Sequence, residues 1–388
     1  MLDTNKLGEK LFSYLHFESD LDKNRNNYKS EIFSKYNLMN EQTYILDEKI
    51  NKYEIPFLYA LPKSKFSDFK TTNDNISSYR ILSVDGSQIE KIGYFSNDDL
   101  NFLINLGTAY LDYIEPENTK LNSRPILFSK SYLSELLDLR INNKEYNKSD
   151  LISSFRTYSE FDETYNIASE SRDKLMIFMD GGLVQWHLQD KPLEIKEFVT
   201  KRISELINLC SIKDITIIGY ISGSKASDVV NCLKIFNCKN NAYNCKYCED
   251  SFCQILNSID DSFLFKTIQE NNDPDKLIIS PIFQSTAKIL DYYKSNIYFF
   301  YIYNRDEFVR VEITPNSIDN IVELSSIIRD QIMKGFGYPV VISEAHEMAV
   351  VTESDRMNFE RIIESISLQF NMTEKKRSKN ISKRLKYI

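Results

Sequence analysis

The sequence has few of the residues that fibrous, membrane-embedded or linker-dominated proteins require. Glycine (10 residues) and proline (9 residues) are scarce in a chain of 388, which excludes a collagen-like or mainly linker-like architecture. No apolar run reaches the roughly 18 residues of a membrane-spanning helix, and the first residues lack the basic-then-apolar order of a signal peptide. Basic residues are outnumbered, with 48 Lys and Arg against 56 Asp and Glu. Any contact with nucleic acid must therefore depend on a local basic patch or on bound metal ions.

The composition is otherwise that of an ordinary globular protein, with 42% hydrophobic and 27% charged residues. We expect a cytoplasmic protein whose cysteines are reduced. Apolar strand patterns alternate with helical patterns from residue 78 onward, which predicts an α/β fold with a mixed sheet flanked by helices. The expected organisation is an N-terminal helical arm (residues 1–77, most simply a solvated appendage), one domain (78–373) with a cysteine-rich insertion (232–263), and a basic tail (374–388).

Two predicted strands run into Asp-Gly pairs, Asp85-Gly86 and Asp180-Gly181. For each pair alone a tight turn is the simplest interpretation, because Asp and Gly both favour turns. Two such aspartates at the ends of buried strands also suit a shared site at one sheet edge. Paired carboxylates are what hold Mg²⁺ or Mn²⁺ ions in two-metal hydrolytic sites.

Three further regions supply candidate groups. Arg156, Glu160 and Glu163 share one face of a predicted helix, so that a glutamate can join the aspartates while Arg156 contacts phosphate; an exposed i,i+4 ion pair is the plainer alternative. His346 follows Ser343, a candidate helix cap, and its imidazole can bind metal or carry a proton near pH 7. Lys225 lies at a predicted helix start, where anions bind well.

These motifs, taken in order, resemble the NurA nuclease family. The resemblance rests on Asp85-Gly86-Ser87, Phe178-Met179-Asp180-Gly181, the segment SGSKASDVVN (222–231) and GYPVVISEAHEMAVV (337–351), with LINLG (103–107) and Trp186 pointing to the cyanobacterial-type branch. It covers about residues 78–370. One departure is Asp180-Gly181-Gly182, where the family usually has Asp-Gly-Ser.

The resemblance implies a ribonuclease-H-like fold and a Mn²⁺- or Mg²⁺-dependent nuclease acting on DNA ends, an exonuclease with endonuclease activity left open. It further implies double-strand break processing with a HerA-type hexameric ATPase, and a homodimer. Asp85 and Asp180 match the family's metal-binding aspartates and His346 its late histidine. Glu160 is preferred over Glu163 as the third carboxylate, Asp85 is assigned as the bridging ligand, and Lys225 as a phosphate contact. The alternative is a catalytically weak DNA-end-binding or ATPase-adaptor protein with the same fold.

Five of the six cysteines fall between residues 232 and 253. Cys238, Cys245, Cys248 and Cys253 offer four thiolates, and Cys245-x₂-Cys248 has zinc-knuckle spacing, so we expect structural Zn²⁺. An iron–sulfur cluster or free buried thiols remain open, and Cys232 is assigned to the core. The basic tail either adds salt-sensitive DNA contacts or is a solubilising extension.

Overall fold

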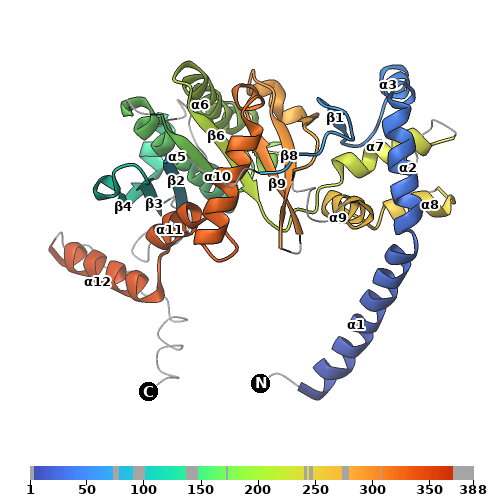
Figure 1. The fold of residues 1–388 in the computed structure, drawn as a ribbon. Coiled ribbons are helices and arrows are strands. Elements are labelled where there is room, and N and C mark those ends of the chain that lie inside the picture. Colours follow the sequence, from blue (N-terminus) through green and yellow to red (C-terminus); the bar gives the residue numbers. More distant parts are fainter. Residues whose placement is uncertain are drawn as a thin grey trace.

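The centre of the molecule is a mixed nine-stranded sheet, seen edge to edge across Figure 1. The computed structural model describes residues 4–72, 78–90, 101–136, 147–171, 174–239, 243, 248–272, 279–305 and 307–369. The strand order is β1-β7-β8-β9-β6-β5-β2-β3-β4. The strands are β1 (Ala60–Pro62), β2 (Arg80–Ile89), β3 (Phe102–Asp112), β4 (Lys120–Phe128), β5 (Met176–Asp180), β6 (Thr216–Ile221), β7 (Phe283–Ser285), β8 (Tyr298–Asn304) and β9 (Glu307–Ile313).

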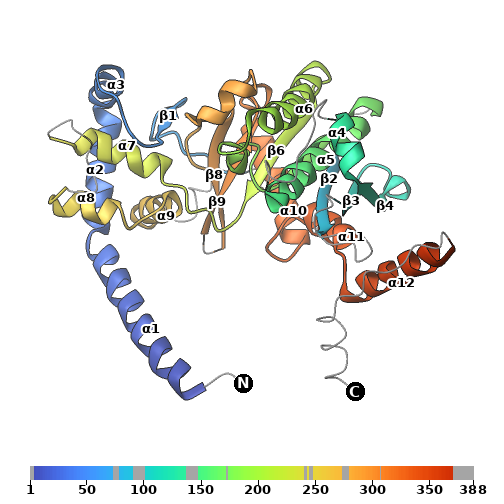
Figure 2. The ribbon, with the colours of Figure 1, turned by 180° about the vertical axis from the view of Figure 1, so that it is seen from behind.

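Helices cover both faces of this sheet. Helices α10 and α11 lie on the face nearer the viewer in Figure 1, and α5 and α6 lie on the opposite face, which Figure 2 turns forward. The helices are α1 (Thr4–Asn27), α2 (Lys29–Glu41), α3 (Thr43–Lys52), α4 (Lys130–Leu136), α5 (Lys148–Glu170), α6 (Leu193–Ile212), α7 (Asp228–Asn237), α8 (Ser251–Leu256), α9 (Asp261–Asn271), α10 (Ile321–Lys334), α11 (Val340–Ala349) and α12 (Glu353–Gln369). The expected mixed α/β architecture is confirmed.

Alternation along the central strands assigns each side chain to one of these faces. In β2, Leu82 and Val84 join the core beneath α5 and α6, whereas Ile81 joins the core beneath α10 and α11. In β5, Met179 belongs to the α5–α6 core and Phe178 to the α10–α11 core. Because side chains of a strand alternate strictly, this pattern fixes the direction of the polar residues that follow.

The second Asp-Gly motif ends a strand as predicted, but the first does not. Strand β2 continues through Asp85-Gly86-Ser87 to Ile89, paired residue by residue with β3. The turn expected there is wrong, because ten residues of antiparallel ladder override the local turn preference of Asp-Gly-Ser.

The N-terminal segment is more than a solvated appendage. Ile32, Tyr36 and Met39 of α2 and Leu46 of α3 are fully or almost fully buried, in a second core shared with α7, α8 and α9. Strand β1 also pairs with β7 at the sheet edge. Residues 28–62 therefore complete the fold beside the segment expected to be an insertion.

Helices α1 and α12 project from the body in both views (Figures 1 and 2). Among the helices that the structure describes, none combines the length and apolarity that crossing a bilayer requires. The basic tail expected at 374–388 lies outside the described residues.

Candidate active site

Asp85 and Asp180 lie side by side on neighbouring parallel strands. Ile81 pairs with Met176 and Leu82 with Ile177, and the same register carried forward sets Asp85 opposite Asp180. Strands in a sheet are about 4.8 Å apart. By the alternation described above, both carboxylates point to the face covered by α10 and α11.

Helix α11 and the turn before it supply a partner for each aspartate. The Nδ1 atom of His346 lies 2.8 Å from Oδ2 of Asp85, so that a protonated Nδ1 donates to the carboxylate. The hydroxyl of Tyr338 donates to Oδ1 of Asp180 at 2.6 Å. Burial, followed by the hydrogen bond to Asp180, raises the pKa of Tyr338, which keeps this phenol protonated as a donor.

Glu160 reaches the two aspartates from the opposite face of the sheet, where α5 crosses β2. Its Oε1 would lie only 2.8 Å from a Cβ built on Gly86, and the same Cβ would lie 2.9 Å from Cγ of Arg156. The glycine at position 86 therefore lets α5 approach the strand beside Asp85. The glycine after Asp85 is thus explained by this close packing and not by a turn, since the strand continues here.

The three carboxylates influence one another electrostatically. Burial raises the pKa of Glu160 to about 8; the charge of Arg156 opposes this rise, and the charges of Asp85 and Asp180 add to it. Nε of Arg156 lies 3.5 Å from Oε1 of Glu160, and its Nη1 donates to Gln88 on β2 at 3.2 Å. Glu160 therefore sits where negative charge is already concentrated.

Glu163, the alternative third carboxylate, has a different partner. Its Oε2 accepts from Nη2 of Arg124 on β4. The part of α5 that faces Asp85 and Asp180 thus carries Glu160.

The position of His346 depends on a second close approach, between β3 and α11. A Cβ on Gly107 would lie 2.1 Å from the carbonyl oxygen of Ala345 and 2.2 Å from the amide nitrogen of Ala349. Asn105 adds a hydrogen bond of 2.9 Å from its side-chain amide to the carbonyl of Ala349. His346 lies in the last turn of α11, which begins at Val340, so the expected cap at Ser343 is wrong.

A model of the NurA domain matches residues 79–351. The chain belongs to the NurA family. The match spans the sheet from β2 onward together with α5, α6, α10 and α11. The function of the NurA domain is nuclease-related. The comparison with curated proteins found no match.

Sequence patterns did not reveal two side chains that support this NurA domain's aspartates. Tyr338 lies in the segment GYPVVISEAHEMAVV (337–351), but that pattern predicts no role for it. Glu312 lies in no recognisable motif. Glu312 is fully buried, and its Oε2 accepts the backbone N–H of Val184 at 2.9 Å. A Cβ on Gly182 would lie 2.9 Å from the same oxygen. The Asp-Gly-Gly departure therefore has a packing reason, because Glu312 fills the space that a serine at position 182 would need.

Buried charge partners hold Glu312 in place. Its Oε1 accepts from Nε of Arg310 at 3.1 Å, and Nη1 of Arg310 lies 2.6 Å from Oδ2 of Asp228 on α7. The guanidinium also stacks 3.7 Å from the ring centroid of Phe299. This network links the second core to the turn after Asp180.

The oxygens of Asp85, Asp180 and Glu160, with the imidazole of His346, are the donor types that Mn²⁺ and Mg²⁺ accept. A divalent cation would relieve the repulsion from Asp85 and Asp180, which adds to the effect of burial on the pKa of Glu160. Within the described ranges, no three His, Cys, Asp or Glu side chains are already gathered into a metal-binding group. The aspartates are engaged instead by His346 and Tyr338.

The remaining candidates lie elsewhere. Lys225, in the loop between β6 and α7, pairs with Asp260 at 3.5 Å. Among the cysteines, Cys238 ends α7, Cys248 precedes α8 and Cys253 lies on α8; Cys245 falls outside the described residues. Cys232 is fully buried on α7, as expected.

Proposed function

We propose that this protein is a metal-dependent deoxyribonuclease that hydrolyses phosphodiester bonds at DNA ends. The observation that carries the proposal is the approach of Glu160 to the strand of Asp85, next to Asp180. Burial above all raises the pKa of Glu160 to about 8, and the charges of Asp85 and Asp180 add to that rise. Structural ion-pair networks also shift pKa values, but they place opposite charges together. Three carboxylates beside one arginine suit cation binding better.

The chemistry divides between the side chains and the ions they would hold. Bound Mn²⁺ or Mg²⁺ lowers the pKa of a water molecule and neutralises charge at the leaving oxygen. Asp85, Asp180 and Glu160 would hold these ions. Tyr338 fixes the orientation of Asp180 through its 2.6 Å hydrogen bond.

His346 and Arg156 would act on the substrate. With Nδ1 of His346 bonded to Asp85, the other ring nitrogen can exchange a proton with a phosphate or leaving group. Arg156 borders Glu160 on α5 and presents a planar guanidinium suited to a phosphate.

The finer family expectations belong to the same proposal. The antiparallel unit β2-β3-β4 followed by parallel β5 and β6 supports the ribonuclease-H-like fold. We propose that the protein works as a homodimer with a HerA-type hexameric ATPase in double-strand break processing, as an exonuclease with endonuclease activity left open. A structural Zn²⁺ at Cys238, Cys245, Cys248 and Cys253 remains a prediction, tested by elemental analysis of wild type and Cys245→Ser.

The deciding experiment compares Asp85→Asn with Asp319→Asn in Mn²⁺-supported release of nucleotides from linear DNA. Asp319 is exposed and follows β9, which runs antiparallel to β6. It therefore lies toward the opposite strand ends from Asp180, and its variant controls for loss of one surface charge. We expect Asp85→Asn to abolish cleavage with nearly unchanged thermal unfolding, and Asp319→Asn to cleave normally. Retained cleavage by Asp85→Asn would refute the assignment, and a wild type that binds DNA ends without cleaving them would favour the adaptor alternative.

A further inference from the structure

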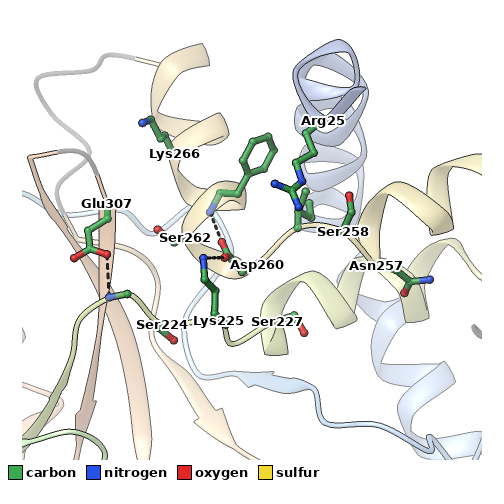
Figure 3. Close-up of a pocket in the computed structure, with 13 residues that line it drawn as sticks. Arg25, Ser224, Lys225, Ser227, Asn257, Ser258, Asp260, Ser262, Lys266 and Glu307 are labelled. Carbon is green, nitrogen blue, oxygen red and sulfur yellow. Dashed lines mark hydrogen bonds and ion pairs between the residues drawn. The ribbon is translucent and has the colours of Figure 1, made fainter. Parts of the chain in front are cut away.

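The protein has a polar cavity of about 550 Å³ away from the carboxylate site, by which we mean Asp85, Asp180, Glu160 and His346. None of these four residues lines the cavity. The loop after β6, the turn between α8 and α9, the start of β9 and the end of α1 form its walls, as Figure 3 shows. Three basic side chains line it, Arg25, Lys225 and Lys266. They come from three segments far apart in the sequence, so that the positive charge gathers here only in the folded protein.

The two acidic residues of the cavity already have internal partners. Oδ1 of Asp260 accepts the backbone N–H of Phe263 at 2.9 Å and caps α9. Glu307 accepts the N–H of Gly223 at 3.0 Å. Lys225 approaches Asp260 only to 3.5 Å, and its side chain is 88% exposed. This lysine can therefore turn toward an anion in the cavity at little cost.

The neutral lining groups suit a nucleic-acid backbone. Ser224, Ser227, Ser258 and Ser262 contribute hydroxyls and Asn257 a side-chain amide. Serine, asparagine, lysine and arginine side chains make most protein contacts to phosphate and sugar oxygens. A pocket for an apolar small molecule would instead be lined mainly by hydrophobic and aromatic groups.

The topology connects this cavity to the carboxylate site. Strand β6 runs parallel to β5, with Asp180 opposite Tyr220, and the Gly223–Lys225 loop follows β6 directly. Both sites therefore lie toward the same ends of the neighbouring parallel strands β5 and β6. A DNA strand that crosses these strand ends can contact both.

We propose that the cavity is an anchoring subsite that binds a backbone phosphodiester of the DNA strand whose scissile bond lies at Asp85 and Asp180. The inference rests on the proposed nuclease function. It assigns Lys225, Lys266 and Arg25 to strand binding, at a position distinct from the reacting phosphate.

The test measures binding of a fluorescent single strand of about 20 nucleotides in EDTA, which prevents metal-supported cleavage, at salt concentrations from about 50 to 200 mM. We expect Lys225→Ala to weaken binding roughly fivefold and to reduce the slope of log affinity against log salt concentration by about 0.7. Lys225→Ala/Lys266→Ala should reduce that slope by about twice as much. Lys201→Ala is the matched control, because Lys201 is an exposed lysine on α6. Affinity and slope equal to wild type in the double variant, with normal thermal unfolding, would overturn the proposal.

Two further measurements separate this subsite from a site for free product and from the nuclease function. Excess mononucleotide should compete weakly with the strand; strong competition, lost in Lys225→Ala, would show a nucleotide site instead. In Mn²⁺, the double variant should raise the KM for a strand of about 20 nucleotides far more than the KM for one of about 4 nucleotides; equal effects on both lengths would overturn the proposal. If neither wild type nor any variant cleaves DNA, the proposed nuclease function is refuted. The binding measurements in EDTA would still test the anchoring subsite.

Discussion

The close packing of β3 against α11 predicts a large effect of adding a single methyl group at Gly107. At Gly107 a new Cβ would face the carbonyl of Ala345 and the amide of Ala349, and the nearer contact of 2.1 Å is 0.9 Å shorter than Cβ atoms tolerate. Both opposing atoms are backbone, so no side chain can rotate away. Gly107→Ala must therefore push α11 away from β3 by at least that distance.

The displacement has a cost in stability and a cost at the site. Overpacking costs about 1–3 kcal/mol or more, and we take about 3 kcal/mol because backbone meets backbone. With an unfolding entropy of about 2.1 cal/mol/K per residue, a chain of this length loses about 4 °C in Tm. The same shift would stretch the 2.8 Å hydrogen bond between His346 and Asp85 beyond its effective range.

Thermal unfolding and Mn²⁺-supported cleavage of linear DNA measure these two effects. Gly8→Ala in α1 is the control, because a Cβ there has no neighbour within 4 Å; its Tm should equal or slightly exceed that of wild type. If Gly107→Ala unfolds within 1 °C of wild type and cleaves normally, α11 does not pack on β3 as described.

Three other variants test the electrostatics of the site. Glu160→Gln should flatten the pH dependence of Tm in EDTA. The pKa of Glu160 is near 4.5 in the unfolded chain and about 8 in the folded one, so its contribution to stability is complete below pH 4.5 and is lost as the pH rises to about 8. A variant whose Tm changes with pH as that of wild type does would contradict the raised pKa. Tyr338→Phe, which removes the hydroxyl from Asp180, should keep Tm within about 2 °C but raise the Mn²⁺ concentration for half-maximal cleavage several-fold; an unchanged Mn²⁺ curve would leave the hydrogen bond without function. Glu312→Gln should lower Tm by roughly 4–6 °C, because breaking a buried pair with Arg310 costs about 3–5 kcal/mol; a Tm equal to wild type would show that the pair contributes nothing.

Strong periodic patterns made much of the architecture predictable. The apolar runs before Asp180 and after residue 214 became β5 and β6, and the helical period between residues 194 and 210 became α6. The hairpin around Asn304 formed β8 and β9. In these segments local preference and burial demand the same structure.

Local signals failed where distant packing decides the outcome. Asp85-Gly86-Ser87 has turn composition, yet its pairing with β3 and the approach of α5 keep it in a strand. The N-terminal segment is polar on average, yet Ile32, Tyr36 and Met39 are buried against helices about 200 residues later in the chain. Average composition could not show that a few apolar positions share one face.

The candidate site was predictable only as far as residue type and order reach. The sequence singled out Asp85, Asp180, Glu160 and His346. In the structure His346 contacts Asp85, Asp180 lies on the neighbouring strand, and Glu160 packs beside Gly86. Glu312 could not be found, because its contact with the backbone of Val184 joins segments that meet only in the folded protein.

The continuous ladder through Asp85 sets a limit on how this chain can change. A single residue added to or deleted from β2 before Asp85 would turn the carboxylate to the α5 side and exchange every following contact with β3. Loops tolerate such length changes, but the ten paired residues of β2 contain no loop that could absorb them. The length of the strand up to Asp85 is thus as strictly determined as the identity of the aspartate itself.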